Sequence, residues 1–130
     1  MTLSPSRERD AALLVPFAIR VQPEREAVHV SPVGELDIAT VGALRGEVEE
    51  LIAAGFGRVV IDLRGLRFIG CAGLKLLRAL DVAARRDGWG LALIQGPAAV
   101  RRLFALTATL DALPFASPAS LPRPDARAST

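Results

Sequence analysis

The residue best placed to do chemistry in this chain is a thiol. Cys71 follows an apolar run at residues 59–63 and a short connection, and it precedes a leucine-rich segment that begins at Leu74. The small residues at 70–73 predict the start of a helix, where unpaired backbone N–H groups and the positive end of the helix dipole favour an anion or a protein contact. No carboxylate stands directly before the thiol. The pattern therefore favours a regulated contact.

An enzyme would need more than this thiol. A cysteine at a helix start can act as a nucleophile or redox sensor, but Cys71 is the only cysteine and His29 the only histidine. Arg78 lies one residue too far along for the Cys-x5-Arg phosphate cradle of phosphatases. The sequence also lacks a phosphate loop, a nucleotide fingerprint, a catalytic dyad and a metal-ligand cluster. We therefore expect Cys71 to be a small filler in a non-enzyme with no catalytic residues, no cofactor and no metal.

The other polar candidates have structural alternatives. Glu35 and Asp37 fit either the rim of a partner-binding site or a pair of solvated loop carboxylates. Thr40 is expected to cap the following helix through its hydroxyl. Asp62, within an apolar run, should lie at the end of a strand or bond to the next turn. His29 is expected on an edge strand, as a surface residue.

Composition excludes several classes of protein. The chain has 130 residues, of which 51% are hydrophobic and 23% charged, as in one soluble globular domain. Its net charge is +2 without a basic block, and aromatic residues make up 5%, which argues against nucleic acid as a partner. The apolar stretch near the N-terminus is too short for a signal peptide or a membrane span. We expect a cytoplasmic protein with no membrane insertion.

The apolar periodicity indicates an α/β domain. It predicts strands at 17–21, 28–30, 58–63, 91–94 and 113–115, and helices at 41–52, 71–87 and 97–107, with residues 34–37 as a loop. Helices that cross between parallel strands give a single, mixed and mostly parallel sheet of about five strands, with the helices packed on it. The expected boundaries are a flexible N-terminal arm at 1–15, the domain at 16–116, and a disordered tail rich in Pro, Ser and Ala at 117–130.

Four motifs in this order resemble a STAS domain, and more narrowly the bacterial anti-sigma factor antagonists (anti-anti-sigma factors). They are Gly34-Glu35-Leu36-Asp37 followed by Thr40, the strand at 59–63, Phe68-Ile69-x-x-x-Gly73-Leu74, and Pro97 followed by Val100-Arg101-Arg102-Leu103-Phe104. The resemblance covers residues 17–115 and implies the STAS fold, a role in regulating sigma-dependent transcription, and no enzymatic activity.

The resemblance also implies a partner and a switch. In that family an Asp-Ser pair opens the second helix, and an anti-sigma factor with an ATP-binding serine kinase domain phosphorylates the Ser. The unphosphorylated domain binds this kinase and frees the sigma factor. Here Gly70 takes the Asp position and Cys71 the phosphoacceptor position. Since a Ser/Thr kinase does not phosphorylate a thiol, we expect the usual switch to be lost.

The surface that the resemblance implies for the partner surrounds Cys71. It comprises Glu35, Asp37, Thr40, Gly70, Cys71, Ala72, Gly73, Leu74, Lys75 and Arg78. An accessory subunit of a lipid- or anion-transport complex is the alternative, and an enzyme such as a thiol peroxidase or phosphatase has least support. The oligomeric state stays open, with a weak homodimer among its alternatives.

Overall fold

The described part of the chain, residues 17–25, 27–107 and 112–116 of a computed structural model, alternates strands and helices. The strands are β1 (Ala18–Pro23), β2 (Ala27–Leu36), β3 (Arg58–Asp62), β4 (Leu66–Ile69) and β5 (Gly90–Ile94). The helices are α2 (Val41–Ala53), α3 (Cys71–Asp87) and α4 (Ala98–Leu106), and a short 3-10 turn, η1 (Leu63–Gly65), joins β3 to β4.

The long strand β2 organises the sheet, whose main path runs β1-β2-β3-β5. β2 pairs with β1 in antiparallel fashion along one side. On its other side, residues 27–30 pair in parallel with β3, and residues 34–36 pair in parallel with β4. The register shifts between Gly34 and Glu35, and Gly34 has a φ of 114°, which glycine adopts without strain. This irregularity lets one strand serve two parallel partners.

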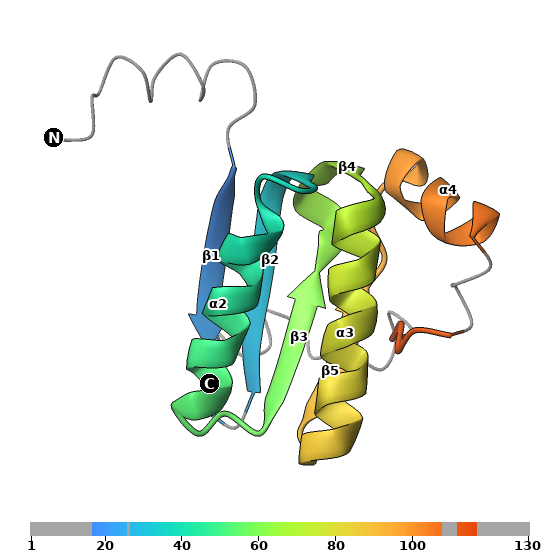
Figure 1. Cartoon of the computed structure of the whole chain (residues 1–130). Coiled ribbons are helices and arrows are strands. Elements are labelled where there is room, and N and C mark those ends of the chain that lie inside the picture. The colour runs from blue at the N-terminus through green and yellow to red at the C-terminus, as the bar shows by residue number, and fades with distance from the viewer. Residues whose placement is uncertain (1–16, 26, 108–111, 117–130) are drawn as a thin grey trace, which may run out of the picture.

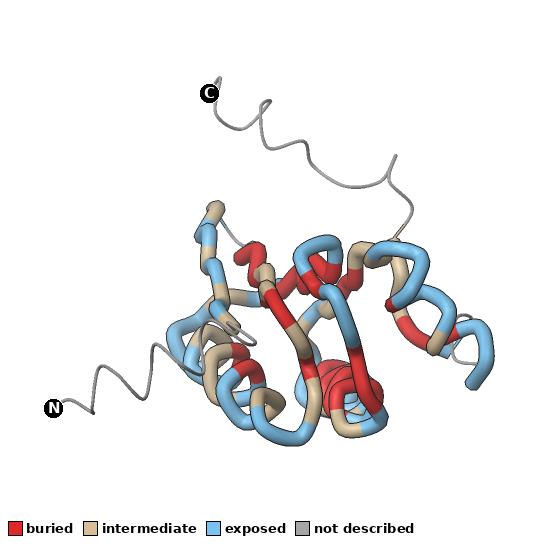
Figure 2. Tube along the Cα trace, turned by 90° about the horizontal axis from the view of Figure 1, so that it is seen from above, coloured by how far each residue is buried: buried red, intermediate tan, exposed pale blue. Residues whose placement is uncertain are grey.

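Helices α2 and α3 cover one face of the sheet (Figure 1). Alternate residues of the strands point into that layer and are fully buried, including Val28, Val30, Val59 and Ile61. In the view from above, buried residues line the sheet and the inner side of α3, while exposed residues follow the outer surfaces of the helices (Figure 2). The core thus fills the space between the sheet and these two helices.

The third helix, α4, packs against β4. Its Phe104 is fully buried and meets Phe115 edge to face, with the ring centroids 5.0 Å apart and an interplanar angle of 78°. The backbone near Phe115 adds one isolated parallel bridge to Leu93 of β5. The chain beyond α4 therefore returns to the sheet edge without forming a strand.

The architecture confirms the predicted fold class, a mixed and mostly parallel five-stranded sheet with three helices. Two details differ. Residues 34–36, predicted as a loop, are the end of β2, and the fifth strand is Leu66–Ile69 instead of 113–115. Leu66–Ile69 shows no alternating pattern, because its two middle residues are both exposed. It becomes a strand by pairing with the part of β2 that extends past β3.

The prediction for His29 is wrong. Its strand, β2, is an inner strand because β1 covers one side of it and β3 the other. His29 is only 7% exposed, and its Nε2 lies 3.3 Å from the carboxylate of Glu24, which precedes the strand. Burial together with a carboxylate makes His29 part of the interior.

The predicted arm at 1–15 and tail at 117–130 lie outside the described residues. The described residues fall within the predicted domain at 16–116. Within them, no helix combines the length and apolar character that crossing a membrane requires.

Candidate functional site

Residues 37–40, between β2 and α2, form a loop that we call the Asp37 loop. This loop and the start of α3 meet at one end of the sheet, although they are far apart in the sequence. The carboxyl ends of β2 and β4 point to this end, and α2 and α3 both begin there (Figure 1). The backbone N–H of Gly70 donates to the carbonyl oxygen of Leu36 at 2.9 Å. This bond joins the end of β2 directly to the residue before Cys71.

Two glycines allow this close approach. A Cβ atom at position 73 would lie 2.7 Å from the Leu36 carbonyl oxygen and 2.7 Å from a side-chain carbon of Ile69. A Cβ atom at position 70 would overlap the carboxylate of Asp37. Position 73 therefore accepts only glycine in this arrangement, whereas a side chain at position 70 would have to displace the Asp37 carboxylate. Gly73 is thus a packing requirement as well as part of a helix start.

Thr40 fixes the shape of the Asp37 loop. Thr40 is the N-cap residue of α2, as predicted, but its side chain makes no capping bond to that helix. Instead its hydroxyl accepts a hydrogen bond from the N–H of Asp37 at 3.0 Å and donates one to the carbonyl oxygen of Glu35 at 2.8 Å. The backbone N–H groups of Thr40 and Val41 both donate to the Asp37 carbonyl oxygen at 2.9 Å. The predicted capping bond from the Thr40 hydroxyl to α2 is therefore wrong. The hydroxyl bonds the backbone of the loop instead.

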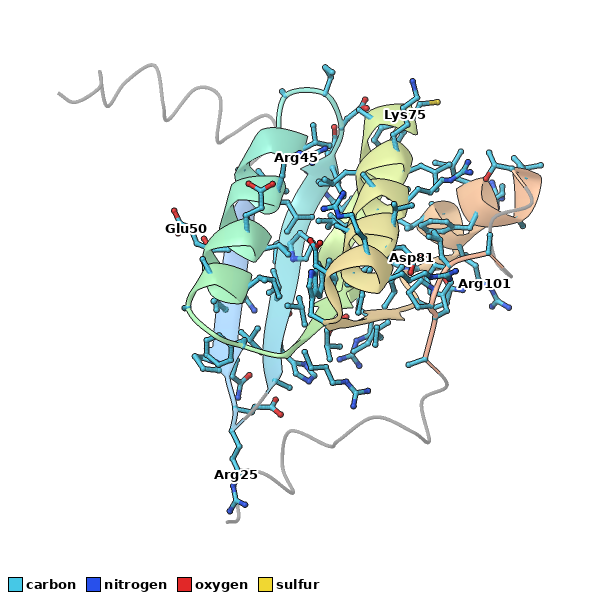
Figure 3. The ribbon with its side chains drawn as sticks, turned by 60° about the horizontal axis from the view of Figure 1, so that its bottom comes forward. Arg25, Arg45, Glu50, Lys75, Asp81 and Arg101 are labelled. Atoms are coloured by element: carbon cyan, nitrogen blue, oxygen red, sulfur yellow. The ribbon has the colours of Figure 1, made fainter. Side chains whose placement is uncertain are left out.

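The predicted surface contains exposed and buried residues. Cys71 is exposed at the first position of α3, Ala72 is half-buried, and Gly73 and Leu74 are buried. Lys75 and Arg78 are exposed on the outer side of the helix. Lys75 points away from the body of the molecule near the start of α3, at the opposite end from Arg25 (Figure 3).

Glu35 is separated from this group by the pleat of its strand. Its neighbour Leu36 is fully buried and reaches Gly73 of α3, so the side chain of Glu35 points to the other face of the sheet. There Glu35 is paired with Phe68 of β4. Only the backbone of Glu35, through its bond from Thr40, takes part in the loop.

Two exposed apolar side chains, one on the loop and one on β4, were not among the residues predicted for the partner surface. Ile38 is 79% exposed in the loop, and Phe68 is 46% exposed on β4. Large apolar groups in these positions are candidates for protein contact. The available signal for Ile38 was a large apolar residue directly after the polar Asp37 of the motif.

The turn that leads into β4 is held by Asp62, as predicted. Its carboxylate accepts the backbone N–H of Arg64 at 3.0 Å and bonds the Arg64 guanidinium through Nε at 2.9 Å and Nη2 at 2.7 Å. Burial raises the pKa of Asp62, but the hydrogen bonds and positive charge of Arg64 outweigh it and hold that pKa below its ordinary value. The ionised carboxylate orders η1 and so directs β4 toward the site.

Helix α3 has one buried and one exposed face. Leu74, Leu77, Leu80 and Ala84 are buried, and Lys75, Arg78, Arg85 and Arg86 are exposed. Leu76 and Asp81 also lie on the buried face, and Asp81 pairs with Arg85 at 3.1 Å.

The described residues hold no group of three or more His, Cys, Asp and Glu side chains that could bind a metal ion. A hollow of about 570 Å³ lies between α2 and α3, lined by Val48, Ile52, Val82 and Trp89 among others. None of the residues predicted for the partner surface lines it. The thiol therefore stands on an exposed surface and not in this hollow.

Comparison with known proteins identifies the family. The family model described as "Mlab, STAS domain" matches residues 19–113, most of the chain. The chain therefore belongs to the STAS domain family. A crystal structure of an anti-sigma factor antagonist from Mycobacterium paratuberculosis superposes with a TM-score of 0.63 and 26% identity, covering 87% of this chain and 92% of that one.

One shorter match and one more distant structure agree with the STAS assignment. The anti-sigma-F factor antagonist RsfB of Mycobacterium tuberculosis is 41% identical over 46 residues, which are 35% of this chain and 38% of RsfB. The chain thus matches less than half the length of that relative. The unphosphorylated anti-sigma factor antagonist SpoIIAA shares the fold, with a TM-score of 0.64 at 20% identity over 78% of this chain and 90% of that one.

The chain is an anti-sigma factor antagonist-like STAS protein. Antagonists of this kind are regulators and not enzymes, in agreement with the sequence analysis. That Cys71 stands in place of a phosphorylated Ser remains a prediction.

Proposed function

We propose that this protein binds an anti-sigma factor with an ATP-binding serine kinase domain in the cytoplasm and so frees a sigma factor for transcription. The contact surface would comprise the Asp37 loop and the first turns of α3. The observation that carries the proposal is the exposed Cys71 at the first position of α3, between a buried Gly70 and a half-buried Ala72. A small, uncharged and exposed helix start can lie flat against another protein.

The side chains around Cys71 support a protein contact. Ile38 offers an exposed apolar group on the loop, and Lys75 and Arg78 offer positive charge on the next turns of α3. The Thr40 hydroxyl fixes the loop, and the backbone bond from Gly70 to Leu36 ties the helix start to the end of β2, so the surface is preorganised. Preorganisation lowers the entropy cost of binding.

We further propose that binding is insensitive to the kinase activity of the partner. Phosphorylation of a hydroxyl at this position would place about −1.5 to −2 charge in the contact and disfavour binding. A thiol at position 71 does not accept phosphate from a Ser/Thr kinase, and Gly70 brings no carboxylate. The protein would therefore act as a constitutive antagonist.

The second candidate is an accessory subunit of a lipid- or anion-transport complex. The matching family model is described as Mlab and not as an anti-sigma factor antagonist, so the family match by itself leaves both partners open. Both candidates use the same helix start, and the identity of the captured protein separates them.

The test is capture of purified anti-sigma factor kinase domains from the same genome by the immobilised full chain. Cys71→Glu adds bulk and charge to the proposed contact and should weaken capture at least tenfold, since a buried unpaired charge costs more than about 1.4 kcal/mol. Val82→Glu is the matched control, because Val82 is 61% exposed further along α3, outside the proposed surface. Equal capture by both variants would place the contact elsewhere.

A kinase assay tests the second part of the proposal. Incubation with a captured kinase domain and radiolabelled ATP should leave the wild-type chain unlabelled, and ATP should not release it. Cys71→Ser, which restores a hydroxyl with little change in volume, is the comparison. Label on residues 70–73 of the wild-type chain would contradict the loss of the switch.

A further inference from the structure

The only histidine of the chain is buried on the sheet face opposite α2 and α3. Val28 and Val30, on either side of His29 in β2, are fully buried in the core between the sheet and these helices. Because successive side chains of a strand point to opposite faces, His29 points to the other face. Its register partners there are Gln22 of β1 and Val60 of β3. A titratable side chain is thus enclosed on an inner strand.

Glu24 reaches His29 from the turn between β1 and β2. The Nε2 atom of His29 lies 3.3 Å from a carboxylate oxygen of Glu24, and each of the two side chains is 9% exposed. The backbone N–H of Glu24 donates to the carbonyl oxygen of Ala27 at 2.8 Å, which closes the turn. The contact between the side chains therefore adds a second link between the end of β1 and the start of β2.

Other charged groups lie on the same face as this pair. Asp62 of β3 faces this side, and its carboxylate bonds the guanidinium of Arg64. Burial is the largest influence on the pKa of Asp62 and raises it, whereas the bonds from Arg64 and the charge of His29 lower it. By the alternation of their strands, Arg20 of β1 and Arg58 of β3 also belong to this face, but both are exposed. Solvent screens these two cations, so the charge of His29 acts mainly on the two carboxylates.

Protonation of His29 balances the buried charges. Glu24 and Asp62 contribute two carboxylates, and Arg64 pairs with Asp62 at 2.7 Å. With His29 protonated, each carboxylate faces a cation. With His29 neutral, the attraction between His29 and Glu24 is lost. Because a charge pair at this distance is strong where solvent is scarce, the surroundings favour the protonated imidazole.

We infer that the His29–Glu24 pair is a pH-dependent clamp on the hairpin of β1 and β2, closed while His29 carries its proton and loosened when His29 releases that proton to solvent. A pair that favours the protonated imidazole stabilises the folded hairpin fully below the ordinary His value of about 6.5. The stabilisation is lost as pH rises through the higher folded value. Among the described strands β1 pairs only with β2, so β1 is the strand that loosening would release.

The titration of His29 can be followed directly, because no other histidine contributes a signal. In proton NMR spectra of the full chain, the imidazole signal should titrate above the ordinary value of about 6.5. Glu24→Gln removes the charge with little change in shape and should lower the midpoint by about 1 pH unit.

Glu50→Gln is the matched control, since Glu50 is exposed on α2, which covers the other face of the sheet (Figure 3). It should leave the midpoint of His29 unchanged. A wild-type midpoint at or below about 6.5 overturns the inference. Equal midpoints in the wild type and Glu24→Gln overturn it as well.

Amide hydrogen exchange tests the clamp itself. After correction for intrinsic exchange, the β1 amides that bond β2 should lose about tenfold in protection between about pH 6 and about pH 8, the size expected for a folded value one unit above the unfolded one. His29→Gln is neutral at both pH values, so its β1 protection should not depend on pH. If His29→Gln does not fold, Glu24→Gln takes its place and should lose less protection than the wild type. The inference is overturned by pH-independent β1 protection in the wild type, or by an equal loss in the variant.

Discussion

At its first turn α3 meets the end of β2 through two glycines, whereas at its last turn it carries charged side chains and closes on Gly88. Near the start, Gly70 bonds Leu36 and Gly73 packs against it. At the end, Arg86 and Asp87 form an exposed ion pair, and Gly88 adopts a φ of 84°. Contacts with β2, far away in the sequence, fix the start of α3, whereas residues within its own last turn and Gly88 fix its end.

The first turn of α3 is constrained by packing, and the last turn is constrained mainly by its contact with solvent. A methyl group added at position 73 would find no free space, whereas the residues of the last turn are exposed to solvent. A surface that is both exposed at Cys71 and tightly packed beneath it suits recognition, because the exposed atoms keep fixed positions. The charged last turn faces solvent, and Gly88 ends the helix.

Gly73→Ala should have the largest effect on stability. Its new methyl group would lie 2.7 Å from a backbone carbonyl that the sheet holds in place. We expect a loss of about 3 kcal/mol, at the upper end for overpacking, measured by urea unfolding followed by circular dichroism. Gly46→Ala in α2 is the control, because nothing lies within 4 Å of the added atom; it should stabilise by up to about 1 kcal/mol. Similar effects of the two variants would contradict the close packing.

Asp62→Asn should rank second and should depend on pH. At pH 7 it removes a carboxylate bonded to Arg64, at a cost of about 1–2 kcal/mol. The folded pKa of Asp62 is lowered, so its stabilisation is complete above the unfolded value of about 3.9 and is lost as pH falls through the lower folded value. Urea midpoints of wild type and variant should therefore converge below about pH 4. A constant difference from pH 7 to pH 3 would refute this account.

Gly88→Ala should cost less, about 1 kcal/mol, because an L side chain pays for the left-handed conformation but meets no atom. Gly88→Asn should lie between wild type and the Ala variant, since Asn tolerates this conformation better. The same urea unfolding measures both. The comparison of the two ends fails if Gly88→Ala costs as much as Gly73→Ala.

Arg86→Ala should have the smallest effect. Their hydrogen bond raises the pKa of Arg86 and lowers that of Asp87, but both groups are exposed. Solvent and salt screen such a pair, so we expect an unchanged urea midpoint at low and high salt. Arg64→Ala, which leaves the buried Asp62 without its guanidinium, should lower the midpoint. A midpoint shift for Arg86→Ala as large as for Arg64→Ala would show that the exposed pair matters.

The predictable parts of the fold were those with local signals. In α3, Leu74, Leu77 and Leu80 recur at helical spacing and are buried, and Gly88 directly follows the last residue of the helix. The bond from Asp62 to the following turn followed from a carboxylate at the end of an apolar strand. Each of these features depends on residues within one or two turns of one another.

The missed parts depend on pairing between distant segments. β4 has two exposed residues in its middle and becomes a strand only because β2 extends past β3. His29 is buried because β3, which follows α2 in the chain, pairs with the side of β2 opposite β1. No pattern within either segment indicates these partners.

The sequence by itself determined the family, the order of helices, and a small, uncharged residue run around the thiol, because periodicity and residue size act over short distances along the chain. Tertiary structure alone decided that Asp37 fills the space beside Gly70 and that Glu35 turns to the other face of the sheet. Those placements follow from where β2 ends relative to α3. That register is fixed by backbone hydrogen bonds between segments far apart in the sequence.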